Sequence, residues 1–255
     1  MDAVGRFAEL VGQPDPPLDR AALVLAAGAD PAVDIEYWLA ELDRLAVGVT
    51  DLGSLLHRLF TEERFTGNTS RYYDPRNSLL PHVLTRRLGI PITLAVVCLE
   101  VGRRAGVAVE GVGMPGHFLV RPTGGQLLLD VFNGGAELTP ADCEARFREL
   151  GGTGPFGPHL LEVATTRAIL ARMLENLRGV FRTLRRPAGT EWVLRMRLSL
   201  PGAGLAEQVE LAQALGSQAK WLEGARILEA QASQAQPSMA RQLEAAARSL
   251  RANLN

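Results

Sequence analysis

The sequence predicts an α+β fold that is followed by an all-α C-terminal domain. Apolar side chains recur at helical spacing in residues 1–60 and 160–255, whereas residues 109–131 alternate with a period of two between Gly and Pro turns. A Gly- and Pro-rich stretch at residues 151–159 separates the two parts. We therefore expect an N-terminal helical region at 1–60, a mixed core at 61–150, a linker at 151–159 and a helical domain at 160–255.

Composition narrows the class of protein. The 255 residues are 47% hydrophobic and 22% charged, which is typical of a folded globular chain, and the net charge of −1 argues against an electrostatic grip on nucleic acid. The longest uncharged apolar stretch, Leu88–Leu99, is well short of the ~20 residues that a membrane helix needs. Asp2, Arg6 and Glu9 interrupt any export signal. We expect a cytoplasmic protein that binds neither membrane nor nucleic acid.

Metal and disulfide chemistry find little support in the sequence. Two cysteines supply at most half of the ligands of a structural zinc site and cannot form a disulfide framework. His82 and His159 have no ligand partner at a suitable spacing. No metal and no cofactor are expected.

Helical patterns dominate the beginning of the chain. The segments Leu18–Ala27, Ile35–Leu45 and Asp51–Phe60 each predict a helix. A polar, turn-rich segment follows. Ser78 then stands as the N-cap candidate of a helix over 79–88.

The next helix is predicted to begin at Pro91, because proline suits a first turn and the residue before it favours extended backbone. Arg103, Arg104 and Gly106 form a C-terminal signature. The period then changes to two. Strands are expected at Val109–Met114, His117–Arg121 and Gln126–Val131, followed by a helix from about Pro140 to Leu150.

The last two of these strands predict a histidine–aspartate pair. If they pair symmetrically about the loop at residues 122–125, Arg121 faces Gln126 and His117 faces Asp130. Opposed residues share a face with Cβ atoms ~4.5–5.5 Å apart, which brings imidazole and carboxylate within reach. A slip of one residue would separate them. The alternative is that His117 is a core histidine and Asp130 only ends its strand.

Such a pair needs a nucleophile, and the N-terminal turn of a helix stabilises developing negative charge. Thr93 occupies that turn of the helix at Pro91. Cys98 points away from it among apolar residues, so we expect it in the core, and a thiol enzyme using Cys98 requires a different helix phase. Cys143 is expected on a partly exposed helix. A threonine hydroxyl is un-ionised at neutral pH and needs a general base.

Every signal after residue 160 is helical, with helices expected at 160–185, 189–199, 204–215, 218–233 and 238–253. Trp221, Ala225, Leu228 and Ala232 form one stripe, and Ala225, Ala232 and Pro237 hold the spacing of the second half of a tetratricopeptide unit. The aromatic residue and the Leu-Gly pair expected in the first half of such a unit are absent from the sequence. A plain helical bundle remains the alternative.

Several motifs together resemble the SirB-type bacterial proteins, which join a transglutaminase-like domain to a tetratricopeptide-like region. The matching segments are residues 65–68, 72–78, 86–94, 111–121 and 130–135, and the run Gly-Met-Pro-Gly-His-Phe-Leu-Val-Arg is the most specific of them. The resemblance implies a papain-like core, in which a helix carrying the nucleophile packs on an antiparallel sheet carrying His and Asp. Carried over, Thr93 stands at the cysteine position, His117 at the histidine and Asp130 at the aspartate. Val131 also departs from the family, where proline often follows the aspartate.

Two functions are consistent with these residues. The first is a transglutaminase-like protein without thiol catalysis, a pseudoenzyme that binds a protein, peptide or other ligand with help from its C-terminal helices. The second is a hydrolase or acyltransferase that uses Thr93 activated by His117 and Asp130. Asp74, Asn77 and Ser78 either line the cleft in both cases or only order a turn.

Overall fold

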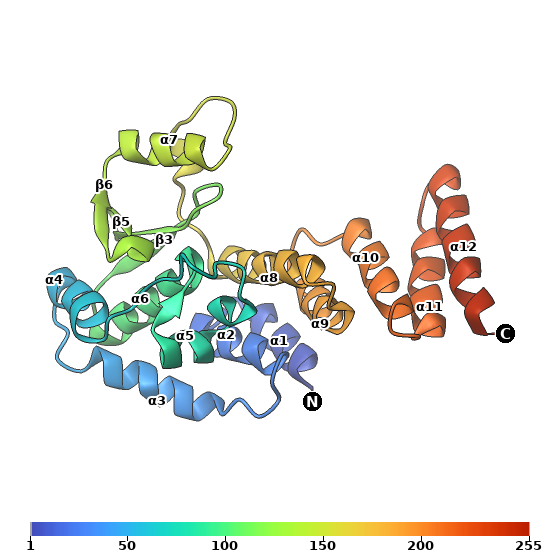
Figure 1. Cartoon of the computed structure of the whole chain (residues 1–255), viewed down its shortest axis with the longest axis horizontal. Helices are drawn as coiled ribbons and strands as arrows, with labels where there is room; N and C mark the ends of the chain where they lie inside the picture. Colours follow the sequence, from blue (N-terminus) through green and yellow to red (C-terminus); the bar gives the residue numbers. More distant parts are fainter. Residues whose placement is uncertain (1, 255) are drawn as a thin grey trace. The chain divides into compact units, whose positions relative to one another are not determined.

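The computed structural model describes residues 2–254. Figure 1 shows the elements in chain order. The helices of the first part are α1 (Ala3–Gly12), α2 (Leu18–Ala27), α3 (Ile35–Ala46), α4 (Leu52–Leu56), α5 (Leu80–Arg86), α6 (Pro91–Ala105) and α7 (Pro140–Glu149). Those that follow are α8 (Thr166–Thr183), α9 (Pro187–Arg197), α10 (Leu205–Gly216), α11 (Trp221–Ala232) and α12 (Pro237–Arg251). The strands are β1 (Thr66–Gly67), β2 (Leu88–Gly89), β3 (Val109–Val112), β4 (Leu119–Pro122), β5 (Leu128–Asp130) and β6 (Ala136–Leu138).

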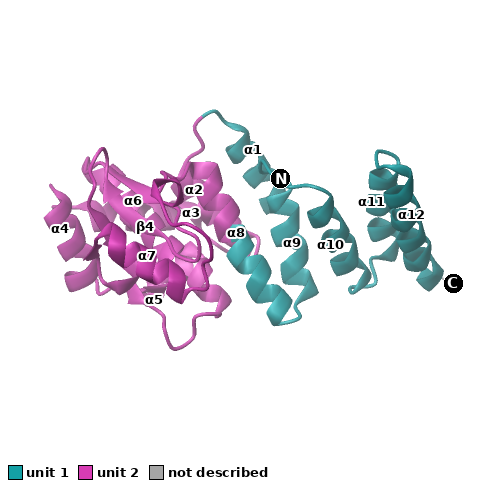
Figure 2. Cartoon of the chain, turned by 90° about the horizontal axis from the view of Figure 1, so that it is seen from above, with its two compact units in different colours: residues 1–14, 174–255 teal, residues 15–173 magenta. Residues whose placement is uncertain are grey.

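The chain divides into two compact units, coloured separately in Figure 2. The core unit consists of residues 15–173, and the helical unit joins residues 1–14 to residues 174–255. Helix α8 contributes residues to both. This division differs from the four segments expected from the sequence, whose status as separate domains stays a prediction.

Helix α6 is the centre of the core unit. Eleven of its fifteen residues are buried, as is typical of a helix that is covered on every side. It contacts β3 and β4 on one side, and α2, α3, α4 and α5 on others. It begins at Pro91 and ends before Gly106, whose φ of 73° supplies the left-handed residue that commonly ends a helix. The predicted α+β class, a helix packed on an antiparallel sheet with helices before and after, is confirmed.

The main sheet has the strand order β3-β4-β5-β6, and each neighbouring pair is antiparallel. Its register differs from the predicted one. Val120 pairs with Leu129, whereas a symmetric four-residue loop would pair it with Leu127, so the register has moved by two residues. Because side chains alternate with a period of two, this shift leaves every residue on its predicted face.

One local prediction before α6 is corrected by the structure. Leu79, and not Ser78, occupies the N-cap of α5 and makes no side-chain cap bond. Asp74 instead caps a short 3₁₀ turn at Pro75–Ser78, accepting from the backbone N–H of Arg76 at 3.0 Å. The parallel pairing of β1 with β2 was not expected, since two-residue strands carry no readable period.

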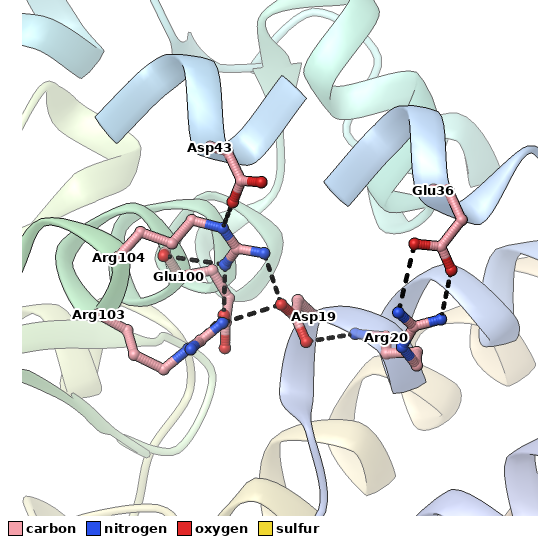
Figure 3. Close-up of polar contacts among 7 residues, drawn as sticks. All are labelled: Asp19, Arg20, Glu36, Asp43, Glu100, Arg103 and Arg104. Carbon is pink, nitrogen blue, oxygen red and sulfur yellow. Dashed lines mark hydrogen bonds and ion pairs between the residues drawn. The ribbon is translucent and has the colours of Figure 1, made fainter. Parts of the chain in front are cut away.

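An ionic cluster joins α2, α3 and the end of α6 (Figure 3). Arg103 and Arg104 donate to Asp19 Oδ2 over 2.9 and 2.6 Å, and both donate to Glu100 Oε2 over 2.9 Å. Arg104 also reaches Asp43 Oδ1 at 2.6 Å. Burial, reinforced by the charge of Asp19, raises the pKa of Glu100. Burial would also raise the pKa of Asp19, but its contacts with Arg104 outweigh this and lower it. The cluster fixes α6 against two neighbouring helices.

In the helical unit, three of the four residues of the predicted stripe of α11 face inward, and Trp221 is only half-buried. Ala225, Leu228 and Ala232 are buried together with Leu243 and Ala247 of α12. Helix α1 joins this unit through contacts with α9, which lies far along the chain (Figure 2). Across residues 2–254, no helix combines the length and the apolar character that spanning a membrane requires.

Candidate functional site

Thr93 lies in the first turn of α6 with its side chain wholly buried. Its hydroxyl donates to the backbone carbonyl of Asn77 at 2.6 Å and accepts from the backbone N–H of Ile90 at 3.2 Å. A Cβ atom on Gly89 would lie 2.9 Å from this hydroxyl oxygen, so a glycine leaves the space that the threonine needs. The hydroxyl therefore ties the start of α6 to the turn that precedes α5.

Asn77 is the centre of a buried network around that turn. Its amide Nδ2 donates to the carbonyls of Arg71 and Tyr72 at 2.7 and 3.1 Å. Its Oδ1 accepts from Asn68 at 2.9 Å and from Arg86 at 3.2 Å. Asn77 thus orders the loop that carries Tyr72.

The two other supporting residues have different surroundings. Asp74 accepts from the side chain of Arg76, and this contact outweighs burial and lowers the pKa of Asp74. Ser78 is buried directly after Asn77 in the 3₁₀ turn. Whether either residue belongs to a cleft stays a prediction.

His117 follows a tight turn and precedes β4. Its backbone N–H donates to the carbonyl of Met114 at 3.1 Å, and Gly116 supplies the positive φ of 76° that this turn requires. The carbonyl of His117 accepts from Arg172 Nη2 of α8 at 2.6 Å. The residue is 4% exposed. Hydrogen bonds to its backbone N–H and to its carbonyl therefore hold His117 in a buried position.

Asp130 ends β5 and is held as firmly. Its Oδ1 accepts from the backbone N–H of Phe132 at 3.1 Å, and its Oδ2 accepts from Asn133 Nδ2 at 2.7 Å. The residue is 1% exposed. Burial would raise the pKa of Asp130, but His117, Asn133 and the Phe132 N–H together outweigh it and lower the pKa.

His117 and Asp130 lie side by side. Nε2 of the imidazole is 2.9 Å from Oδ1 of the carboxylate. The two atoms are within hydrogen-bond distance, but the angle of the contact falls outside that of a well-formed hydrogen bond. Because the register has moved by two residues, the two side chains meet diagonally across the strands and not directly opposite.

The hydrogen bonds of Thr93 are made to backbone groups. Its hydroxyl has two carbonyl acceptors, Asn77 at 2.6 Å and Ile90 at 3.1 Å, and within residues 2–254 no hydrogen bond joins it to His117. The structure thus brings His117 and Asp130 together and commits the Thr93 hydroxyl to the backbone.

Aromatic rings and one arginine beside the pair were not expected from the sequence. The ring of Phe132 lies edge to face with those of His117 and Tyr72, at centroid distances of 6.3 and 6.1 Å. Arg172 holds His117 from a helix more than fifty residues away. The repeated tyrosines and the Asp-Val-Phe-Asn run were visible in the sequence, but nothing in it marked Arg172.

Neither cysteine is a nucleophile in this arrangement. Cys98 has no exposed surface, and burial raises its pKa to about 12, which overturns a thiol mechanism using this residue. Cys143 is also fully buried, so the prediction that it is partly exposed is wrong. It packs with Val112, Met114 and Leu119, because β6 and α7 close over that side of the sheet.

No group of three or more potential metal ligands occurs among residues 2–254.

The comparison with known families bears directly on this arrangement. The family model of the transglutaminase-like superfamily matches residues 34–175, which is more than half of the chain. The chain belongs to this superfamily. The match covers α6, the sheet and the whole of the site just described, and it ends within α8.

The chain is also similar to several named proteins. The chain is 38% identical to a UPF0162 protein of Xylella fastidiosa over 182 residues, which cover 65% of each chain. It is 33% identical to a UPF0162 protein of Pseudomonas aeruginosa over 188 residues, 70% of each. It is also 32% identical to mouse F-box only protein 21 over 136 residues, 49% of this chain and 21% of that protein. The chain thus spans about two thirds of the length of the UPF0162 protein from Xylella fastidiosa.

Proposed function

We propose that this transglutaminase-like chain is a pseudoenzyme that binds a protein or peptide partner, with its C-terminal helices as the principal binding surface. The observation that carries this is the Thr93 hydroxyl, which stands where the family resemblance places a catalytic thiol. It donates its single proton to Asn77 O at 2.6 Å in a fully buried site. A group so placed must first break a buried hydrogen bond before it can attack a substrate.

Two further observations support binding. The helical unit continues for some eighty residues beyond the transglutaminase-like match, far more than the site needs. In mouse F-box only protein 21 the matching segment makes up 21% of a longer chain, as expected of a module combined with other parts. The SirB-type identity, the tetratricopeptide-like character of the tail and a cytoplasmic location belong to this proposal.

A second candidate function rests on the His117–Asp130 contact. With Nε2 at Asp130, the other ring nitrogen, Nδ1, is left as the general base. Thr93 Oγ1 would attack an acyl carbon while its proton passes to His117. The leaving amine or alcohol would then take that proton, and water would release the acid from the ester on Thr93. This hydrolase requires the Thr93–Asn77 bond to open.

The experiment that separates the two treats the full chain with a fluorophosphonate and a β-lactone probe, followed by peptide mass spectrometry. We expect no label on Thr93, and no turnover of a panel of amides and esters. Labelling of Thr93 that disappears in His117→Ala would establish the hydrolase and refute the pseudoenzyme. Thr93→Ser serves as the positive geometry control, because it keeps the hydroxyl and widens access to it.

Thr93→Cys asks a sharper question of the same site. Thr93→Cys supplies the nucleophile of classical transglutaminases, while His117 and Asp130 are unchanged. We expect no transamidase activity, because the side chain still faces the Asn77 carbonyl. A gain of activity would mean that only the sulfur is missing, and would contradict our explanation of why the site is silent.

A further inference from the structure

The helical unit contains a groove of about 590 Å³ formed by the end of α8, the start of α9 and one face of α10. Its charged lining consists of Arg178, Arg182, Arg185, Arg186 and a single carboxylate, Glu210. The chain as a whole has a net charge of −1, so this concentration of positive charge is local. A surface of this kind attracts anionic groups.

Two of the four arginines, Arg185 and Arg186, have no side-chain partner within the described part of the chain and are free to pair with a ligand. Arg178 already forms ion pairs with Glu175, Glu207 and Glu210. The side chain of Arg182 is 63% exposed and forms a long ion pair of 3.6 Å with Glu210. Arg185 and Arg186 are exposed and form no ion pair with any residue from 2 to 254.

The end of α8 explains how these side chains reach the groove. Arg185 has a φ of 51°, a left-handed conformation that glycine usually supplies. The N–H of Arg186 donates to Phe181 O at 2.9 Å and that of Arg185 to Arg182 O at 3.1 Å, which closes the helix. Cations also suit the negative end of a helix dipole, but that preference does not require an arginine at the left-handed position.

The remaining lining gives the groove a mixed character. The half-buried Pro187 and Val209 supply apolar surface next to the buried Phe181 and Ala214, and the exposed Gln213 lies among them. Guanidinium groups bind carboxylates through bidentate hydrogen bonds, and an apolar surface accepts aliphatic side chains. Phe181 is the one aromatic ring in this lining, which leaves little for bases to stack on. Peptide therefore fits better than nucleic acid.

We infer that this arginine-lined groove binds an acidic peptide segment of a partner protein, with Arg185 and Arg186 pairing its carboxylates. The apolar wall takes an aliphatic side chain of the same segment. This inference rests on the proposed binding function and names the chemical class of its partner.

The test measures fluorescence anisotropy of the full chain with a fluorescein-labelled peptide of sequence Glu-Asp-Leu-Glu-Glu-Asp-Leu-Glu, and with its Gln/Asn/Leu counterpart. The key variant is Arg185→Gln/Arg186→Gln. The matched control is Arg226→Gln/Arg241→Gln, which removes two exposed arginines of α11 and α12 and has the same net charge. We expect the acidic peptide to bind, its Kd to rise at least ~10-fold in the key variant and with added salt, and the control to bind as the wild type does.

Equal binding by the key variant, or equal binding of the neutral peptide, would overturn the inference. So would tighter binding of a single-stranded oligonucleotide of matched charge, or full displacement of the peptide by inorganic phosphate at equal concentration. A second experiment distinguishes failure of the groove inference from failure of the proposed binding function: a random phage-displayed peptide library is selected on the full chain. Enriched peptides without acidic residues would refute the groove and leave the binding function intact, whereas Thr93-dependent turnover would refute the binding function and leave the anisotropy result standing.

Discussion

Replacing Thr93 with valine is the most direct probe of what its hydroxyl does. Valine has nearly the same shape, so the substitution opens no cavity and removes only the hydroxyl group. It leaves two buried backbone groups, the Asn77 carbonyl and the Ile90 N–H, without the partner they have in the structure. Leaving one buried polar group unsatisfied costs about 1–3 kcal/mol. We therefore expect Thr93→Val to lower the free energy of unfolding by about 2–4 kcal/mol.

The matched variant is Thr93→Ser, which keeps the hydroxyl and loses one methyl group. Its cost is about 1 kcal/mol from the buried methyl alone. Trp38 is the single tryptophan of the core unit, since the other two, Trp192 and Trp221, lie in the helical unit. Urea unfolding followed by tryptophan fluorescence in a Trp192→Phe/Trp221→Phe background therefore reports the core unit by itself.

The order of the two variants decides the question. If the hydroxyl is a structural clamp, valine is less stable than serine by about 1–3 kcal/mol. If the unfolding free energy of Thr93→Val lies within about 0.5 kcal/mol of the wild-type value, the hydrogen bond from Thr93 to Asn77 contributes nothing to stability. That result would refute the argument that this bond keeps the hydroxyl from acting as a nucleophile.

Three further predictions test other parts of the structure. Burial raises the pKa of Glu100 in the folded state, so the stability that its protonated form contributes is complete below about pH 4.3 and is lost as the pH rises through the folded-state pKa. The unfolding free energy of the wild type relative to Glu100→Gln should therefore fall between about pH 4 and 8. A difference that stays constant or rises over this range would contradict the prediction. Arg185→Gly should stabilise the chain by about 0.5–1 kcal/mol in thermal unfolding, through relief of the left-handed arginine, while weakening acidic-peptide binding; a destabilised variant would argue against backbone strain there. Gly67→Ala should destabilise the core unit by about 1–3 kcal/mol in urea unfolding, because the added Cβ would lie 2.6 Å from Phe132. The control Gly113→Ala meets only ordinary contacts at 3.8 Å and should cost less than about 1 kcal/mol, so similar losses in both variants would refute the steric explanation.

Local signals predicted the elements of this chain well. Proline at position 91 and glycine at position 106 mark the ends of α6 because each acts on its own backbone, without help from distant residues. The pairing of His117 with Asp130 could be anticipated for a related reason. Alternation along two strands fixes their faces, and a shift of two residues in register does not change a face.

Contacts between distant segments were beyond the sequence. Arg172 reaches the carbonyl of His117 from α8. Cys143 is buried by packing against residues distant in the sequence, which the spacing of apolar residues along its own helix does not reveal. The bond from Thr93 to Asn77 belongs to the same class, since a backbone acceptor leaves no mark in the amino-acid pattern. A motif could place the hydroxyl at the site, but only the coordinates show where its proton goes.

The helical unit takes its first helix from one end of the chain and the rest from the other. Helix α1 ends at Gly12, whereas its partner α9 begins only at Pro187. On a ribosome that adds roughly 5–20 residues per second, the apolar face of α1, with Phe7 at its centre, waits on the order of ten to thirty seconds for that partner to emerge. Burial of this face is therefore completed only after the whole core unit has been synthesised.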